Sequence, residues 1–222
     1  MRCHSLRVSA PRVLYLHGFA SSPGSKKAVA VAERLASRGV LVDRLDLRVP
    51  SMERLDFGAM LDRTREAIGG PEDRAILIGS SLGGLTAARV AEHDRRVVAM
   101  VLLAPALHFG ARWRERLGQE GWDQWMERGW LEVHDYATGG TVRVHADFAR
   151  SVLHHDVGLP YIHPPTLVLH GTDDDVVPVT VSRELAAVSP QVRLVELPDG
   201  HDLLATLPQI LDSIEAFVLA QE

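Results

Sequence analysis

The stretch Ile76-Leu77-Ile78-Gly79-Ser80-Ser81-Leu82-Gly83-Gly84 decides how this chain is organised. Three apolar β-formers run into a Gly-x-Ser-x-Gly sequence, and a run of small, helix-compatible residues begins at Leu82. The pattern predicts a strand, a sharp turn and a helix, with the Ser81 hydroxyl exposed on the turn at the end of a sheet. Side chains at positions 79 and 83 would collide with the neighbouring strand or helix, which explains the two glycines.

Length and composition predict a globular protein. The 222 residues suit one domain with an inserted subdomain, and a hydrophobic content of 46% supports a sizeable core. The net charge of −5, without a basic block, argues against nucleic acid as a partner. One cysteine, Cys3, and no visible secretory signal favour a cytoplasmic location. No apolar run is long enough for stable membrane insertion.

Strand and helix patterns alternate on both sides of a different middle segment. Strands are expected over 12–16, 40–45, 75–78, 97–103, 164–171 and 191–197, with a minor one over 6–8. Helices are expected over 26–38, from position 50 to 68, and over 82–93, 182–188 and 208–218. This order predicts an α/β fold, a mostly parallel sheet of about six strands with helices on both faces. The half-polar strand over 191–197 is expected at an edge.

Residues 105–164 interrupt this alternation and contain all four tryptophans. Helical pieces are expected over 111–128, a hairpin over 131–135 and 141–145, and a short helix capped by Asp147. We interpret the segment as a cap inserted into a core formed by residues 1–104 and 165–222. Trp113, Trp122 and Trp125 either line an acyl or alcohol pocket or form the cap's own small core, and the sequence favours neither.

Three further loops that follow strands carry residues that an activated serine needs. In His17-Gly18-Phe19, the Phe19 N–H is a candidate oxyanion donor, together with the N–H of Leu82. Among the aspartates 173–175, the spacing Gly-x-x-Asp-x-x-Val-Pro favours Asp174 as the orienting carboxylate. His201 is the histidine that follows the last strand, so we expect it to act as the base.

Metal binding is not expected. The three adjacent aspartates lack a second ligand cluster, and the spacing of His154, His155 and His163 fits no usual zinc site. These histidines are expected to be solvated or capping groups of the insertion. No cofactor is expected either.

Taken together, these motifs resemble the α/β-hydrolase superfamily over residues 13–104 and 165–218. The resemblance rests on Leu-His-Gly-Phe, Gly-Ser-Ser-Leu-Gly-Gly, Pro-Thr-Leu-Val-Leu-His-Gly-x-x-Asp-x-x-Val-Pro and a late Gly-His. The segment from Leu16 to Lys26 is similar to that of small intracellular bacterial esterases of the YqiA-like group and related acyl-thioesterases.

This resemblance implies hydrolysis of a small-molecule carboxylic ester through an acyl-enzyme, with Ser81, His201 and Asp174 as a triad. Three alternatives stay open at this point. The same triad also serves acyl-thioesterases and serine peptidases, and the same fold can serve as a non-catalytic ligand receptor.

Overall fold

The computed structural model of this protein describes residues 10–221. The minor strand expected over 6–8 lies outside the described residues. Within them, the order of elements follows the predicted alternation of strands and helices, interrupted by the predicted insertion.

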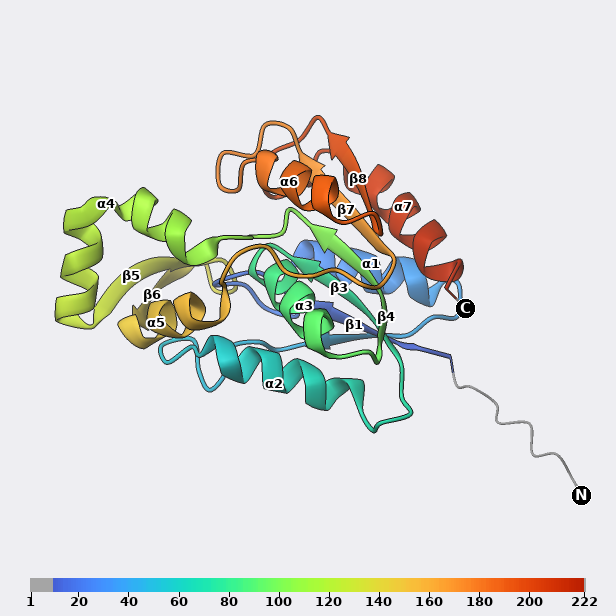
Figure 1. Cartoon of the computed structure of the whole chain (residues 1–222), viewed down its shortest axis with the longest axis horizontal. Coiled ribbons are helices and arrows are strands. Elements are labelled where there is room, and N and C mark those ends of the chain that lie inside the picture. Colours follow the sequence, from blue (N-terminus) through green and yellow to red (C-terminus); the bar gives the residue numbers. More distant parts are fainter. Residues whose placement is uncertain (1–9, 222) are drawn as a thin grey trace, which may run out of the picture.

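A parallel sheet forms the centre of the molecule (Figure 1). Its strands are β1 (Arg12–Leu16), β2 (Val42–Leu45), β3 (Ala75–Ser80), β4 (Val97–Leu103), β7 (Thr166–Gly171) and β8 (Val192–Leu197). They lie in the order β2-β1-β3-β4-β7-β8, and each neighbouring pair is parallel. The half-polar last strand is at an edge, as predicted, and β3 lies in the middle, where it can place Ser81 centrally.

Helices cover both faces of the sheet, as expected for parallel strands with crossover connections. Helices α1 (Lys26–Ala36) and α7 (Leu207–Leu219) pack on one face, and their apolar residues share a cluster. Helices α2 (Phe57–Ile68), α3 (Leu82–His93) and α6 (Thr180–Val188) contribute to a second cluster on the other face. The fold class expected from the sequence is therefore confirmed.

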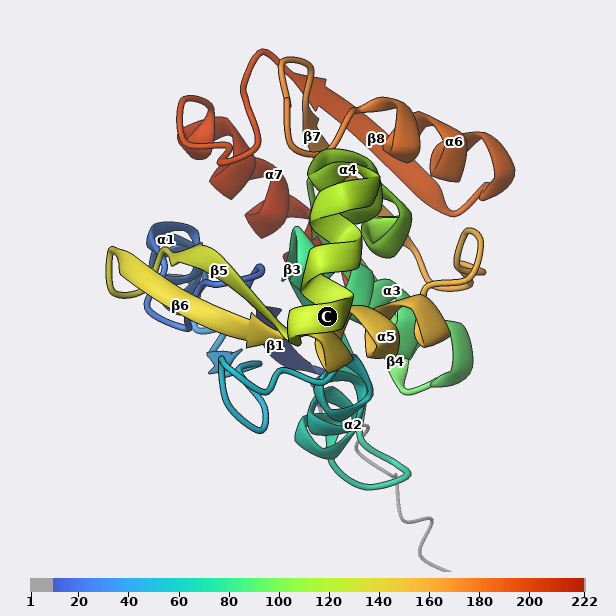
Figure 2. The ribbon, with the colours of Figure 1, turned by 90° about the vertical axis from the view of Figure 1, so that its left-hand side faces the viewer.

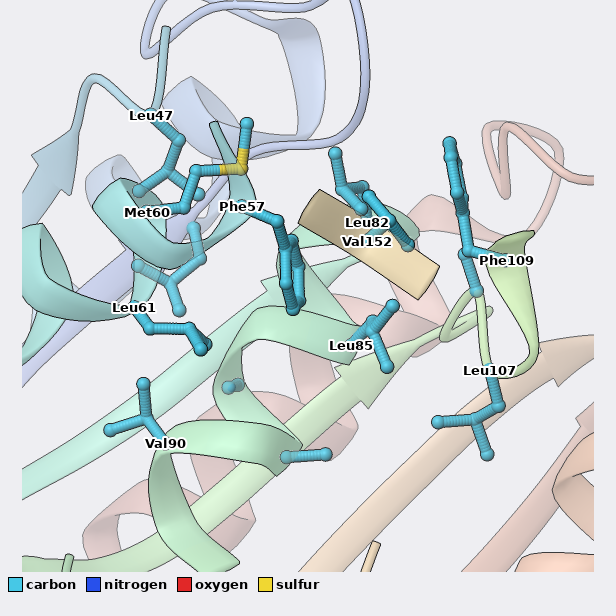
Figure 3. Close-up of a cluster of buried hydrophobic side chains, with 14 of the residues drawn as sticks. Leu47, Phe57, Met60, Leu61, Leu82, Leu85, Val90, Leu107, Phe109 and Val152 are labelled. Atoms are coloured by element: carbon cyan, nitrogen blue, oxygen red, sulfur yellow. The ribbon is translucent and has the colours of Figure 1, made fainter. Parts of the chain in front are cut away.

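The inner strands β1, β3, β4 and β7 are apolar at most positions because successive side chains enter opposite clusters. In β3, Leu77 joins the cluster of α2 and α3, whereas Ile76 and Ile78 join the cluster of α1 and α7. Figure 3 shows part of the first cluster, where Phe57 of α2 and Leu85 of α3 lie among its buried side chains. The buried helix α3, which follows Ser81 directly, thus supports the turn that carries it.

The insertion contains α4 (Phe109–Arg128), β5 (Trp130–Asp135), β6 (Gly140–His145) and α5 (Ala146–His155). Strands β5 and β6 form the expected antiparallel hairpin. Gly118, with φ of 66°, divides α4 into two helical pieces. The insertion lies on the left of Figure 1, and Figure 2 shows it in front of the sheet.

The caps that begin α2 and α5 differ from those that the sequence predicts. The helix expected from position 50 begins at Phe57, because Asp56 Oδ1 accepts a hydrogen bond from the Ala59 N–H at 2.7 Å. The cap of α5 is His145, not Asp147, since the His145 ring accepts the Asp147 N–H at 3.3 Å. A histidine ring rarely caps helices, so sequence preference points to the aspartate.

Candidate active site

Ser81 lies on the turn between β3 and α3 with φ of 52° and ψ of −116°. A positive φ is uncommon for a residue with a side chain and stores strain in the backbone. The Ser81 carbonyl accepts hydrogen bonds from the N–H groups of Gly84 at 2.9 Å and Ala106 at 3.0 Å. These bonds tie the turn to α3 and to the segment after β4, and so hold the strained serine in place.

The glycines on either side of Ser81 allow close backbone approach. A Cβ atom on Gly83 would lie 2.1 Å from the Leu16 carbonyl oxygen, and one on Gly79 would lie 2.3 Å from the Gly83 oxygen. Both contacts involve backbone, which cannot move aside cheaply. The collision predicted from the sequence is thus confirmed.

The structure brings Ser81, His201 and Asp174 together in a hydrogen-bonded chain. His201 Nε2 lies 3.0 Å from Ser81 Oγ, and His201 Nδ1 lies 2.7 Å from Asp174 Oδ2. A carboxylate only accepts, so Nδ1 carries a proton and leaves Nε2 able to accept the serine proton. This is the relation that a nucleophile, its base and an orienting carboxylate require.

Asp174 is the buried member of the three adjacent aspartates, whereas Asp173 and Asp175 are exposed. Its Oδ1 accepts the N–H groups of Val176 at 2.9 Å and Val177 at 2.7 Å. Burial raises the pKa of Asp174, but hydrogen bonds from the neighbouring imidazoles outweigh this effect and lower the pKa overall. The carboxylate therefore stays ionised beside His201.

A second histidine, His170 near the end of β7, also contacts Asp174. Its Nε2 lies 3.2 Å from Asp174 Oδ2 and 2.8 Å from the Val177 carbonyl oxygen, and its Nδ1 lies 2.7 Å from Ser182 Oγ. His170 is not among the site residues expected from the sequence. A polar residue ending an otherwise apolar strand, four positions before Asp174, was the available signal.

Asp199, which is not among the site residues expected from the sequence, organises the loop that carries His201. Its Oδ1 accepts the Gly200 N–H, and its Oδ2 accepts both the N–H and the hydroxyl of Thr206, each at 2.8 Å. These bonds close the loop on both sides of His201. Thr206 lies seven positions after Asp199, just before the last helix. Their hydrogen bonds depend on how the loop folds back, which no local sequence pattern shows.

The two predicted oxyanion donors lie beside Ser81. Leu82 follows the serine directly, and a Cβ atom on Gly18, next to Phe19, would lie 3.3 Å from Ser81 Cβ. Among residues 10–221, neither the Phe19 nor the Leu82 N–H donates to a protein acceptor. Both groups are thus free to bind a substrate oxygen.

His17 orients the peptide that contains the Phe19 N–H. Its Nε2 accepts the Leu47 N–H at 3.0 Å, so its Nδ1 carries the proton that is donated to the Gly18 carbonyl at 2.9 Å. Burial lowers the pKa of His17, which favours this neutral form. In a trans peptide, the Phe19 N–H points away from that carbonyl.

The three tryptophans named from the sequence lie in different surroundings. Trp122 and Trp125 are buried, and the Trp125 indole N–H donates to the Val144 carbonyl at 3.1 Å inside the insertion. Trp113 is half-buried, and its ring centroid lies 5.0 Å from that of Phe19. This placement favours a core role for Trp122 and Trp125 and leaves Trp113 nearest to the predicted oxyanion loop.

The insertion also holds both loops that flank the Ser81–His201 pair. The Tyr136 N–H donates to the Ala20 carbonyl at 2.8 Å, and the Arg112 guanidinium donates to the Val176 carbonyl. Burial lowers the pKa of Arg112, and the charge of Asp174 opposes this shift. The segment 105–164 is therefore hydrogen-bonded to the loop of Phe19 and to the loop of Asp174.

Lys27, on the first turn of α1, adds a cation near the same carboxylates. Burial lowers the pKa of its amine to about 8, against the opposing charges of Asp202, Asp174 and Asp199. No side chain among the described residues forms a hydrogen bond or ion pair with Lys27. Together with Arg112, it partly balances the negative charge around His201.

Two cavities differ in position and lining. One of about 450 Å³ lies between α2, α3 and α5, and its lining includes Arg89, which already pairs with Glu92 at 3.0 Å. None of its lining residues belongs to the Ser81 site. A space of about 10 Å³, at the lower limit of what admits one water molecule, adjoins Phe19 and Leu82. Its remaining lining includes Leu47, Met52, Leu55 and Met60.

Within residues 10–221, no group of three or more His, Cys, Asp or Glu side chains is arranged to hold a metal ion. The helices described there are all too short or too polar to cross a membrane.

Mammalian relatives match nearly the whole length of this chain in sequence. The chain is 28% identical to mouse (Mus musculus) palmitoyl-protein thioesterase ABHD10, mitochondrial, over 96% of this chain and 79% of the relative. Its human (Homo sapiens) counterpart is 26% identical, over 96% and 77%. These relatives are mitochondrial, whereas a cytoplasmic location remains a prediction for this chain.

Solved structures agree. Alpha/beta hydrolase domain-containing protein 10 from mouse superposes with a TM-score of 0.79 at 22% identity, covering 96% of this chain and 92% of that one. Ferulic acid-bound Est1E from Butyrivibrio proteoclasticus has a TM-score of 0.76 at 20% identity, covering 98% and 92%. Residues 12–218 match the family described as Uncharacterised protein family (UPF0227). The chain therefore belongs to the UPF0227 family and has the α/β-hydrolase fold.

Proposed function

We propose that this protein hydrolyses carboxylic esters through an acyl-enzyme formed on Ser81. The observation that carries the proposal is the hydrogen-bonded chain from Asp174 through His201 to Ser81, at 2.7 and 3.0 Å. Two unpartnered N–H groups beside Ser81 support it, because acyl transfer develops negative charge on the carbonyl oxygen.

The reaction uses these groups in two stages. Ser81 Oγ attacks the ester carbonyl while His201 Nε2 takes the hydroxyl proton, and the N–H groups of Phe19 and Leu82 bind the oxyanion. His201 then gives its proton to the leaving alcohol, so that the acyl group remains on Ser81. A water molecule, deprotonated by His201, attacks the acyl-enzyme, and His201 returns the proton to Ser81 Oγ as the acid leaves. Asp174 stabilises the imidazolium in both stages, and each oxyanion donor is worth about 3 kcal/mol.

Thioesters form a second candidate substrate class. The relatives at 28% and 26% identity are called palmitoyl-protein thioesterases, and the chemistry at the acyl carbon is the same. We place the acyl chain beside Trp113, which packs against Phe19 of the oxyanion loop. Matched oxygen esters and thioesters of one acyl chain separate the two classes by their kcat/KM values.

The test combines turnover with labelling. A fluorophosphonate should modify Ser81 alone, as located by peptide mass spectrometry, and a panel of p-nitrophenyl esters and acyl thioesters should show turnover that the label abolishes. Labelling elsewhere, or Ser81→Ala with wild-type turnover, would refute the proposal. Labelling without turnover would favour a ligand receptor, and cleavage of aminopeptidase substrates in preference to esters would favour a peptidase.

A further inference from the structure

We propose that His170 is a positioning residue that holds the Asp174 carboxylate in the orientation that serves His201. This inference rests on the proposed function of Ser81 and assigns a second imidazole to the same carboxylate.

The position of the proton on His170 follows from its partners. A backbone carbonyl only accepts hydrogen bonds, so the Nε2 atom at 2.8 Å from the Val177 oxygen must carry a proton. The same N–H lies 3.2 Å from Asp174 Oδ2 and is shared between the two acceptors. In the neutral ring, Nδ1 then accepts the Ser182 hydroxyl at 2.7 Å. Ser182 thus sets the ring so that Nε2–H faces the carboxylate.

His170 connects Asp174 to the rigid part of the protein. Two of the carboxylate's donors, the N–H groups of Val176 and Val177, come from its own loop, and a third, His201, lies on another loop. His170 instead belongs to β7, a buried strand of the central sheet. It is therefore the donor that fixes Oδ2 relative to the sheet.

His170 cannot exchange roles with His201. The side chains of His170 and Ser182 are fully buried, so no substrate reaches them. A role in packing alone would not require the Nε2–H to face a carboxylate oxygen. The contact with Asp174 therefore suggests a role in holding the carboxylate.

Other charges around this pair must be considered in any pH measurement. His201, Lys27 and Arg112 act on Asp174 from three different elements, and Glu196 of β8 is the register partner of His170. Glu196 is bound to Arg183 of α6 at 2.6 Å. Asp199 and Asp202 lie on the His201 loop and face Lys27. None of these groups is altered by the substitutions below.

Two substitutions replace the ring by an amide whose N–H lies at different positions. His170→Gln places an amide N–H near the position of Nε2, whereas His170→Asn places one near Nδ1 and removes the donor to Asp174. We expect His170→Asn to lower kcat by about 10- to 100-fold with little change in KM, the range for outer hydrogen-bond partners of a site. His170→Gln should restore most of this loss.

The pH profile provides a readout that loss of packing would not move. A carboxylate with one donor fewer concentrates more negative charge towards His201 and favours the imidazolium. The acidic limb of the kcat/KM profile should therefore shift to higher pH in His170→Asn and remain in place in His170→Gln. Carbon-13 NMR of Asp174 should show its pKa raised in His170→Asn, which needs no substrate.

A folded His170→Asn variant with wild-type kcat, pH profile and Asp174 titration would overturn the inference. Equal damage in His170→Gln and His170→Asn would overturn it as well. If His170→Asn does not fold, Ser182→Ala takes its place, because it frees the ring from its orienting hydroxyl. It should show a smaller effect in the same direction. A Ser182→Ala variant without any such effect would contradict the inference. The proposed function fails separately, if the wild type lacks turnover or Ser81→Ala retains it.

Discussion

Asp174 has a serine–histidine pair on each side, and the two sides differ in access rather than in residue types. On one side, His201 lies 2.7 Å from the carboxylate and 3.0 Å from Ser81. On the other, His170 lies 3.2 Å from the carboxylate and 2.7 Å from Ser182. The His201 side chain is 23% exposed, whereas that of His170 is completely buried.

The difference shows what distinguishes a candidate reaction site from a supporting network. Ser81 lies on a strained turn with free N–H groups beside it, whereas Ser182 lies within α6 and its hydroxyl is used by His170. Serine, histidine and aspartate within hydrogen-bond distance are thus insufficient for catalysis. Access for the substrate and donors for an oxyanion are also required.

The largest expected effect distinguishes the two serines. Ser81→Ala should lower kcat by about 10⁵- to 10⁶-fold, because the nucleophile is lost. Ser182→Ala should lower kcat by about tenfold at most and reduce stability by about 1–3 kcal/mol, because a buried hydrogen bond is lost. Ester turnover and urea unfolding measure the two effects. Comparable loss of turnover in both variants would remove the distinction between the two sides.

The carboxylate shared by both sides should be next in magnitude. Asp174→Asn should lower kcat by about 10⁴-fold, since the amide no longer holds the His201 tautomer. The exposed neighbour Asp173→Asn is the matched control and should stay near wild type. An inactive control with an active Asp174→Asn variant would transfer the role to Asp173.

The same substitution should change how stability depends on pH. Asp174 has a lowered pKa in the folded protein, so its charge stabilises the fold above the pKa of an unfolded aspartate, about 4. That contribution disappears as the pH falls through the lowered folded value. The difference in unfolding free energy between wild type and Asp174→Asn should therefore be largest at neutral pH and shrink below pH of about 4. A constant difference from pH 7 to pH 2 would contradict the lowered pKa.

A smaller effect is expected where the cap touches the Asp174 loop. Arg112→Ala removes the guanidinium that donates to the Val176 carbonyl. The N–H of the same residue, Val176, donates to Asp174. A hydrogen bond is worth about 0.5–1.5 kcal/mol, so kcat/KM should fall about two- to tenfold. Arg116→Ala, in an exposed position on the same helix, is the control. Identical kinetics of the two variants would show that the cap does not steady this loop.

The smallest effect on rate is expected from a substitution that changes substrate choice instead. Trp113→Leu should alter the ratio of kcat/KM between short and long acyl esters by about tenfold. The smaller side chain enlarges the pocket by the volume of one or two methylene groups. Trp122→Phe should leave that ratio unchanged and lower thermal stability. An unaltered chain-length profile for Trp113→Leu would assign all three tryptophans to the core of the cap.

The sequence by itself determined the order of elements and the candidates for each catalytic part. Apolar strands followed by loops with Ser81, Asp174 and His201 are local patterns, and parallel strands bring such loops to one edge of the sheet. The buried sheet and the edge position of β8 also follow from hydrophobic pattern alone. The spacing further distinguished Asp174 from Asp173 and Asp175, and the structure places Asp174 within reach of His201.

Only the tertiary structure decided which polar groups support those candidates. His170 and Asp199 find their partners across loops whose return path no local pattern specifies. The burial of Trp125 and the anchoring of the cap by Arg112 likewise depend on how the insertion packs against the sheet. Local spacing sets what a segment can form, whereas hydrogen bonds between distant segments exist only after the chain has closed around them.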